Sequence, residues 1–146
     1  MLHIIRELLS LEPTSTGTNV AQALQYFTNA QKRHCTAFLI SDFIGSGDMY
    51  QPLMIASNRH EVNAIQIYDR REAEMPNIGL VKFHDAETGN DIWVDTAIGS
   101  VREAYAQAWR NNQTEIQQLF TRTGVSQVSV RTDEDYVKAL MHLFKC

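Results

Sequence analysis

The chain has 146 residues, of which 44% are hydrophobic, and its 13 basic and 17 acidic side chains give a formal net charge of −4. This length suits one domain with its own core, and the weak acidity argues against nucleic-acid binding, which usually needs a concentrated basic face. No apolar run approaches the roughly 20 residues of a membrane-spanning helix, so we expect no membrane contact by this segment.

The first half of the chain alternates between helix and strand patterns. Helices are predicted where apolar residues recur every three or four positions, and strands where short apolar runs are bounded by polar residues. The expected elements are a helix over residues 2–10, a helix from Val20 to near Arg33 capped by Thr18, a buried strand over 36–40, a helix over 49–58 and a buried strand over 61–68. This alternation predicts a parallel sheet.

The second half adds a different motif before the helix–strand pattern returns. Two short β runs around a glycine-containing turn predict a hairpin, inserted at about residues 78–96. Ser100 and Glu103 have the spacing of a capping box, and they would open a long helix that Gly124 closes. A strand over 125–131 and a final helix complete an α/β pattern.

Cysteine use and the N-terminus indicate the compartment. Cys35 and Cys146 are too few for a disulfide framework, and reduced thiols are usual in the cytosol. The amphipathic N-terminus carries Glu7 and does not resemble a signal peptide. We therefore expect a cytoplasmic protein.

Polar residues follow the predicted strands where a parallel sheet binds its ligands, at the carboxyl ends. The positions selected are Ser41-Asp42, Asp69 and Thr132-Asp133, and the loop that ends at Thr18 opens on the same rim. A hydroxyl and a carboxylate that converge there suit a hard cation such as Mg²⁺. The spacing alone is a weak signal for a metal, and it favours Thr18 as a helix cap and Asp42 as a strand-end acceptor.

At this rim the sequence resembles a known family. Thr16-Gly-Thr-Asn-Val-Ala-Gln-Ala-Leu24 and Phe38-Leu-Ile-Ser-Asp-Phe43 resemble the second and third motifs of von Willebrand factor A domains and, more narrowly, the bacterial DUF58 family. The likeness covers nearly the whole chain. It continues through Tyr68-Asp-Arg-Arg-Glu72, Met75-Pro76, Asp85-Ala-Glu-Thr-Gly89, Asp95-Thr96 and Thr132-Asp-Glu-Asp-Tyr136.

The resemblance implies a Rossmann-like, three-layer α/β fold with a mostly parallel sheet and an added hairpin. It also implies a metal-ion-dependent adhesion site, in which Thr18 is the threonine ligand and Asp42 is the aspartate of the third motif. The first motif, Asp-x-Ser-x-Ser, is absent from the chain. We therefore expect residues 1–146 to be the C-terminal part of a truncated, single von Willebrand factor A-like domain. Its partial site would hold no metal alone, and Mg²⁺ would bind in the full-length protein.

Two functions of different classes remain open. The resemblance implies a non-enzymatic protein-interaction module that partners a MoxR-type AAA+ ATPase. The alternative is a metal-assisted hydrolase that uses the same rim, with Asp69 as a general base near Asp42. If the strand over 36–40 lies at an open sheet edge, that edge needs covering. We then expect self-association into a homo-oligomer through the edge, or a helix laid over it.

Overall fold

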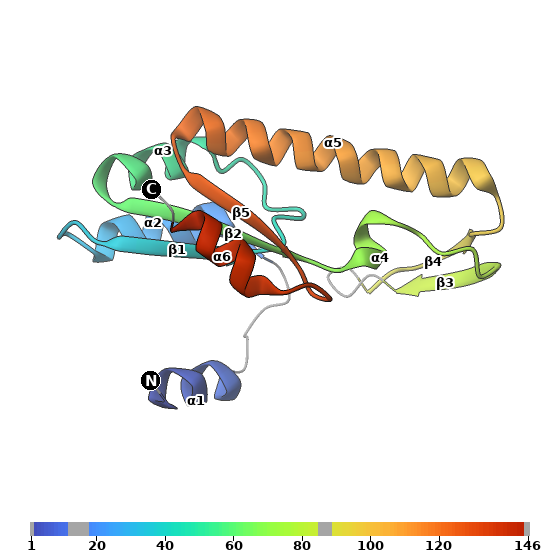
Figure 1. The fold of residues 1–146 in the computed structure, drawn as a ribbon, viewed down its shortest axis with the longest axis horizontal. Helices are drawn as coiled ribbons and strands as arrows, with labels where there is room; N and C mark the ends of the chain where they lie inside the picture. The colour runs from blue at the N-terminus through green and yellow to red at the C-terminus, as the bar shows by residue number, and fades with distance from the viewer. Residues whose placement is uncertain (1, 12–17, 85–88, 145–146) are drawn as a thin grey trace.

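The protein is described by a computed structural model, which covers residues 2–11, 18–84 and 89–144. The loop around Pro13, the hairpin turn at Asp85 and the thiol of Cys146 lie outside the described residues. Within these ranges, the structure has the mixed α/β architecture that the sequence predicts (Figure 1).

Three parallel strands form the central sheet, in the order β1 (Thr36–Ser41), β2 (Glu61–Tyr68) and β5 (Ser126–Arg131). The middle strand, β2, is buried over residues 62–66, as its apolar run predicts. The strand predicted at 36–40 is present, but the prediction that it is buried is wrong. In β1, side chains alternate between exposed and half-buried, because this strand lies at the edge of the sheet and one of its faces is only partly covered.

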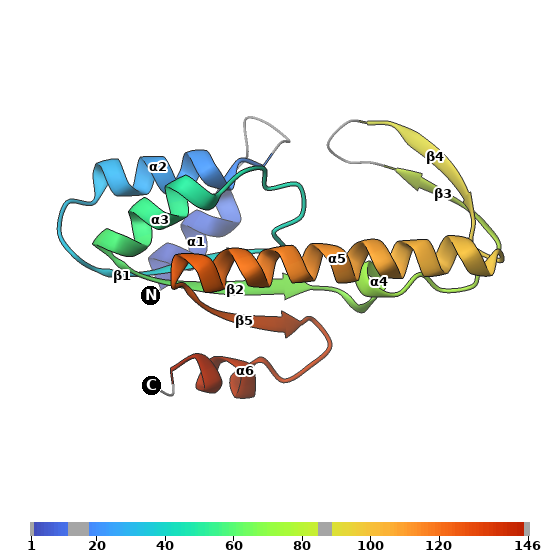
Figure 2. The same cartoon turned by 90° about the horizontal axis from the view of Figure 1, so that it is seen from above.

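Helices cover the two faces of the sheet unequally. Helices α2 (Val20–Ala30), α3 (Tyr50–Arg59) and the C-terminal part of α5 (Gly99–Thr123) pack on one face. Helix α6 (Tyr136–Leu143) lies on the opposite face, beside β5 (Figure 2). The result is a three-layer arrangement. Among the described residues, none of the helices is apolar over a stretch long enough to cross a bilayer.

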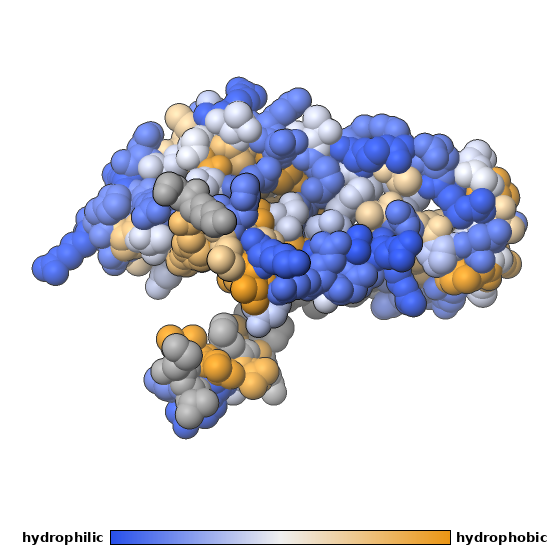
Figure 3. Space-filling model, viewed as in Figure 1, coloured by the Kyte–Doolittle hydropathy of each residue, from blue (hydrophilic) through white to orange (hydrophobic). Residues whose placement is uncertain are grey.

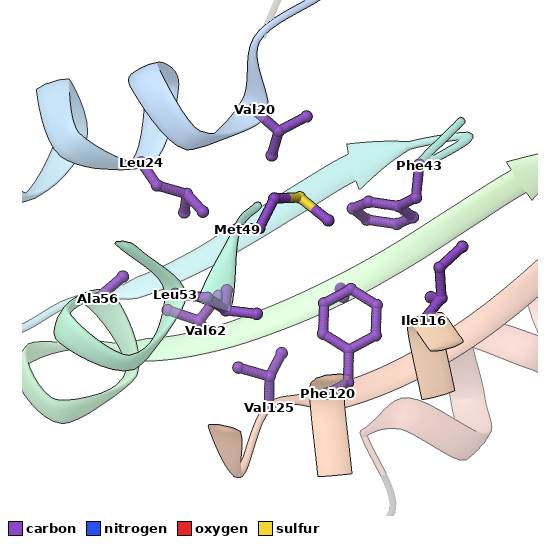
Figure 4. Packing of buried hydrophobic residues seen from close by; sticks show 11 residues of the cluster. Val20, Leu24, Phe43, Met49, Leu53, Ala56, Val62, Ile116, Phe120 and Val125 are labelled. Atoms are coloured by element: carbon purple, nitrogen blue, oxygen red, sulfur yellow. The ribbon is translucent and has the colours of Figure 1, made fainter. Parts of the chain in front are cut away.

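The core lies between β1, β2 and the three helices of the more fully covered face (Figure 4). Phe120 of α5 is 1% exposed, and its ring meets the ring of Phe43 edge-on, with 5.2 Å between centroids. Leu53 and Ala56 of α3 are fully buried against the same cluster. The contact between Phe120 and Phe43 joins α5 to the loop after β1, and it therefore positions the end of β1.

The hairpin lies outside the central sheet, as Figures 1 and 2 show. Its strands β3 (Leu80–His84) and β4 (Asp91–Asp95) pair antiparallel, which confirms the predicted hairpin. Thr96 is fully buried at its base, where its hydroxyl donates to the Gly79 carbonyl at 2.7 Å. The hairpin lies beside the first turns of α5, whose 25 residues span about 37 Å.

Two of the predicted helix caps are wrong. The helix at Val20 is capped by Asn19, whose side chain accepts from the Gln22 N–H at 2.8 Å, and not by Thr18. Helix α5 begins after Ile98 with no side-chain cap, so Ser100 does not start a capping box. A capping box is present instead at the short helix α4 (Arg70–Ala73), between Asp69 and Glu72.

The C-terminal end of α5 is as the sequence predicts. Gly124 ends α5 in the left-handed conformation, with φ 68°, which glycine adopts without steric cost. Asp135 caps α6 by accepting from the Val137 N–H. Asp133 and Glu134, just before it, pair with the Arg131 guanidinium.

Helix α1 (Leu2–Ser10) stands apart from the rest of the molecule in Figure 1. Its residues Ile4, Ile5 and Leu9 are exposed, as is Leu11 after it. Helical spacing predicted this element, but the described contacts do not bury Ile4, Ile5 or Leu9.

The packing of Phe120 predicts a large effect on folding. Phe120→Ala should lower the free energy of unfolding by about 3–5 kcal/mol, because it removes a fully buried ring and leaves a cavity. Chemical denaturation measures this loss. Phe83→Ala, at a hairpin ring that is 38% exposed, is the control and should cost much less. Equal losses for the two variants would contradict the core described here.

Candidate functional site

The predicted rim is formed by the N-terminus of α2 and the carboxyl ends of the three parallel strands. Val20, at the start of α2, and Phe43, just after β1, belong to the same buried cluster (Figure 4). Thr18 and Asp42 therefore lie at the same end of the sheet, and both are exposed.

A tight turn fixes Asp42 at the end of β1. Its Oδ1 accepts from the Ile44 N–H at 3.1 Å, and the Ser41 hydroxyl accepts from the Phe43 N–H at 3.0 Å. Phe43 has φ 59°, a left-handed conformation that costs a residue other than glycine about 1–2 kcal/mol. Burial of the Phe43 ring in the core offsets this strain. The turn therefore holds the Asp42 carboxylate outside the core.

A polar row crosses the three strands just inside the rim. The strand register places Ser41, Gln66 and Ser129 side by side. Gln66 is 2% exposed, and its amide donates to the Asp42 carbonyl at 3.2 Å while its Oε1 accepts from the Ser129 hydroxyl at 3.0 Å. Gln66 thus joins the ends of all three strands. Sequence reasoning missed it, although a glutamine within an apolar strand was a usable signal.

Asp69 joins β2 to β5 further along the rim. Its Oδ1 accepts from the Arg71 N–H at 2.8 Å, and its Oδ2 accepts from the Thr132 hydroxyl at 3.0 Å. The Arg71 N–H and then the Thr132 hydroxyl lower the pKa of Asp69 below its ordinary value. From the register, Asp69 lies two residues beyond the level of Asp42, about 7 Å along the strand direction.

The described residues of the rim do not fit a resident Mg²⁺ ion. This cation takes near-octahedral oxygen ligands, usually including one or two carboxylates and several waters. Thr18 and Asp42 supply one hydroxyl and one carboxylate, and Asp42 Oδ1 already accepts from the Ile44 N–H. Across the described ranges, no group of three or more His, Cys, Asp or Glu side chains is placed to hold a metal ion.

A pocket of about 370 Å³ lies beside the rim, between the loop after β1 and α5. The loop contributes Ser46 and Asp48, and α5 contributes Asn112 and Glu115. The buried Ser46 hydroxyl has no hydrogen-bond partner among the described residues. Neither Asp42 nor Asp69 lines this pocket, so it does not bring the two rim carboxylates together.

Comparison with known proteins establishes the family. Residues 1–115 match the family described as "Protein of unknown function DUF58". The chain belongs to this family. DUF58 membership accords with the motifs at Thr18 and Asp42, and it assigns neither residue a role.

Two mycobacterial proteins similar to this chain are described as uncharacterized. The DUF58 chain is 30% identical over 135 residues to an uncharacterized protein of Mycobacterium avium, covering 91% of this chain and 78% of that protein. It is 31% identical over 127 residues to an uncharacterized protein of Mycobacterium tuberculosis, where it spans only 39% of the relative's length.

A solved structure has a similar fold. The crystal structure of the conserved hypothetical protein BatB from Bacteroides thetaiotaomicron matches with a TM-score of 0.53 at 16% identity. The match covers 97% of this chain and 65% of that chain. At this identity the likeness shows the fold alone.

The Gln66 bridge predicts a non-additive pair of substitutions. Gln66→Met should lower the free energy of unfolding by about 1–3 kcal/mol, because it leaves the Asp42 carbonyl and the Ser129 hydroxyl without a partner. After Gln66→Met, Ser129→Ala should cost less than it does alone. Chemical denaturation of the single and double variants gives the coupling. Additive losses would contradict the bridge, and Gln117→Met at an exposed position of α5 is the control.

The hydrogen bonds of Asp69 predict a pH effect. Its folded pKa lies below the ordinary 3.8, so its stabilising effect is complete above that value and is lost as the pH falls through the folded pKa. Thr132→Val removes one donor and should raise the pKa of Asp69 toward the ordinary value. Acid unfolding should then begin at a higher pH. A carbon-13 NMR titration of the carboxyl group measures the pKa.

Asp91 of the hairpin is the internal control for this titration. Hydrogen bonds from Lys82 and His84 lower the pKa of Asp91, and this carboxyl group has no described contact with Thr132. Thr132→Val should leave the pKa of Asp91 unchanged. An unchanged Asp69 pKa, or an equal rise at Asp91, would show that Thr132 does not donate to Asp69.

Proposed function

We propose that this DUF58 chain is a non-enzymatic protein-interaction module with a von Willebrand factor A-like fold, which binds a partner through the rim at Asp42. The observation that carries the proposal is the exposed Asp42 carboxylate at the end of β1. Its turn holds it in place through the Ile44 N–H and the buried Phe43 ring. A fixed, exposed carboxylate is ready to accept hydrogen bonds from a partner with little further ordering.

The rim supports binding better than hydrolysis. A general base works best with a pKa near the operating pH, whereas the donors around Asp69 lower its pKa. Asp69 also lies about 7 Å beyond Asp42 along the strand direction, and the pocket beside the rim is lined by neither of them. These features favour an open contact surface over a catalytic cleft.

The proposal does not depend on a bound metal. The likeness to von Willebrand factor A domains implies Mg²⁺ in proteins that carry the first motif, but the described rim residues do not fit the ion by themselves. The chain spans 39% of the Mycobacterium tuberculosis relative, so a metal site in any longer protein would need ligands from elsewhere. For this chain, the partner would meet the Asp42 carboxylate directly.

The partner class follows from the resemblance and from the charge of the rim. The resemblance implies a MoxR-type AAA+ ATPase, and the rim presents the carboxylates of Asp42 and Asp69. A complementary surface would offer arginine, lysine or free backbone N–H groups, which fix the orientation of the complex and speed its formation. We therefore propose a basic surface of such an ATPase as the site that meets Asp42.

Asp42→Asn tests the proposed contact. The amide keeps an oxygen for the Ile44 N–H but removes the negative charge, so affinity for a purified MoxR-type ATPase from the same genome should fall about tenfold, as expected for a lost charge-assisted hydrogen bond. Calorimetry or interferometry, with Mg²⁺ and with a chelator, measures the affinity. Binding should be the same in both buffers, because the described donor set does not hold the ion.

Asp48→Asn is the matched control. Asp48 is also an exposed loop aspartate, and its Oδ1 accepts from the Tyr50 N–H at 3.0 Å, much as Asp42 accepts from Ile44. It should leave affinity unchanged. Equal loss in the two variants would indicate a general charge effect, and unchanged binding by Asp42→Asn would rule out the rim as the contact.

A further inference from the structure

The two outer strands of the central sheet, β1 and β5, differ in how polar their side chains are. In β5, Gln127, Ser129 and Arg131 alternate with valines, and polar or charged side chains of this kind discourage pairing with another chain. In β1 the sequence Thr36-Ala-Phe-Leu-Ile-Ser41 has no charge and no proline. Among the described strands, β1 pairs only with β2, so its other edge offers backbone donors and acceptors that no described strand uses.

An apolar surface continues from β1 onto α6. Phe38 and Ile40 are 46% and 58% exposed, on the face of the sheet that carries α6. The Phe38 ring meets the ring of Phe144, just after α6, with 5.8 Å between centroids. Val137 and Met141 of α6 are also exposed and share a helix face. Hydrophobic residues gather over α6 and beside it in Figure 3.

On the other face, an apolar groove of about 380 Å³ runs between α2 and the open edge of β1. Ala23, Leu24 and Phe27 of α2 line one side, and Ala37 and Leu39 of β1 line the other. Side chains of an added strand would enter this groove. The edge of β1 therefore offers backbone groups flanked by apolar surface on both faces.

We propose that two copies of this chain pair antiparallel along β1, making one six-stranded sheet across a two-fold axis. An axis perpendicular to the sheet keeps the α6 faces of both copies on one side, so residues opposite each other share a face. In the register centred on Leu39, Phe38 of each copy lies opposite Ile40 of the other copy, so the two-fold axis produces two such pairs. Aromatic and β-branched residues are a favourable cross-strand pair.

The surface is large enough for a stable dimer, and the dimer closes on itself. A specific interface needs about 1,000 Å² in total, or about 500 Å² from each copy. Four large, half-exposed side chains would bury about 400 Å² of surface per copy: they are Phe38, Ile40, Met141 and Phe144. The groove and the strand edge would bury the rest. Because the second outer strand, β5, is protected by polar residues, assembly stops at two.

Ile40→Lys tests the pairing. Sedimentation velocity over a range of concentrations should give the wild-type chain a mass of twice 16.6 kDa, and the variant a mass of 16.6 kDa. The lysine places two like charges beside the axis and has no partner in the second copy. Ile40 is exposed, so circular dichroism and the melting temperature should confirm a folded variant.

Ile92→Lys is the matched control. Ile92 is also in a strand and is 59% exposed, against 58% for Ile40, but it lies on the hairpin. It should leave the dimer intact. A wild-type chain that stays at 16.6 kDa up to its solubility limit, for example because α1 folds over the patch, would overturn the proposal. So would a dimer that survives Ile40→Lys, or assembly that continues beyond two.

A cross-link tests the register independently of the charge. In a background of Cys35→Ser and Cys146→Ser, Leu39→Cys should form a disulfide between two copies under mild oxidation, because residue 39 faces itself across the axis at about 5 Å between Cβ atoms. Val130→Cys on β5 should not cross-link. Cross-linking at residue 130 and not at 39 would place the interface on the wrong edge and overturn the proposal.

Discussion

The rest of the structure depends on the burial of β2 between two parallel strands and under a layer of helices. Residues 62–66 of this strand are buried, so their backbone groups must all find partners in β1 and β5. This pairing fixes the register of three segments that are far apart in the chain. Once the register is set, the ends of the strands fall at one rim and the residues that follow them are brought together.

The rim shows how this constraint produces a surface with defined chemistry. A buried glutamine, Gln66, could not remain in β2 without hydrogen-bond partners, and it finds them at the ends of both neighbouring strands. The same arrangement holds Asp42 and Asp69 through donors of their own chain. Carboxylates held in this way point outward from the end of the sheet, and the donors around Asp69 also lower its pKa. Such groups are suited to recognition, whereas a general base needs a raised pKa.

Helices and strands cover the two faces and the edges of the sheet to different extents. One face receives α2, α3 and α5, but among the described elements the other face receives only α6, and the outer edge of β1 receives no described strand. As a result, Phe38 and Ile40 remain exposed even though the sequence of β1 is as apolar as that of β2. The free energy available from covering them, at about 25 cal/mol per Å² of apolar area, is the physical basis for pairing between two copies.

Sequence alone determined the order of the described elements apart from the short helix α4, together with the parallel sheet, the hairpin and the glycine end of α5. Each of these depends on local periodicity or on one residue's backbone preference. It also indicated the rim and the DUF58 family. Only the tertiary structure decided that Asn19 caps α2, that Phe43 adopts a left-handed conformation, and that β1 is exposed.

The contact between Asp69 and Thr132 shows why the sequence could not decide more. These residues are 63 positions apart, and no local pattern relates them. Gln66 and Ser129 are also 63 apart, and they meet only because the same register brings β2 and β5 side by side. Helices and strands follow from near neighbours in the chain, whereas the hydrogen bonds of the rim and the exposure of β1 follow from which segments pack together.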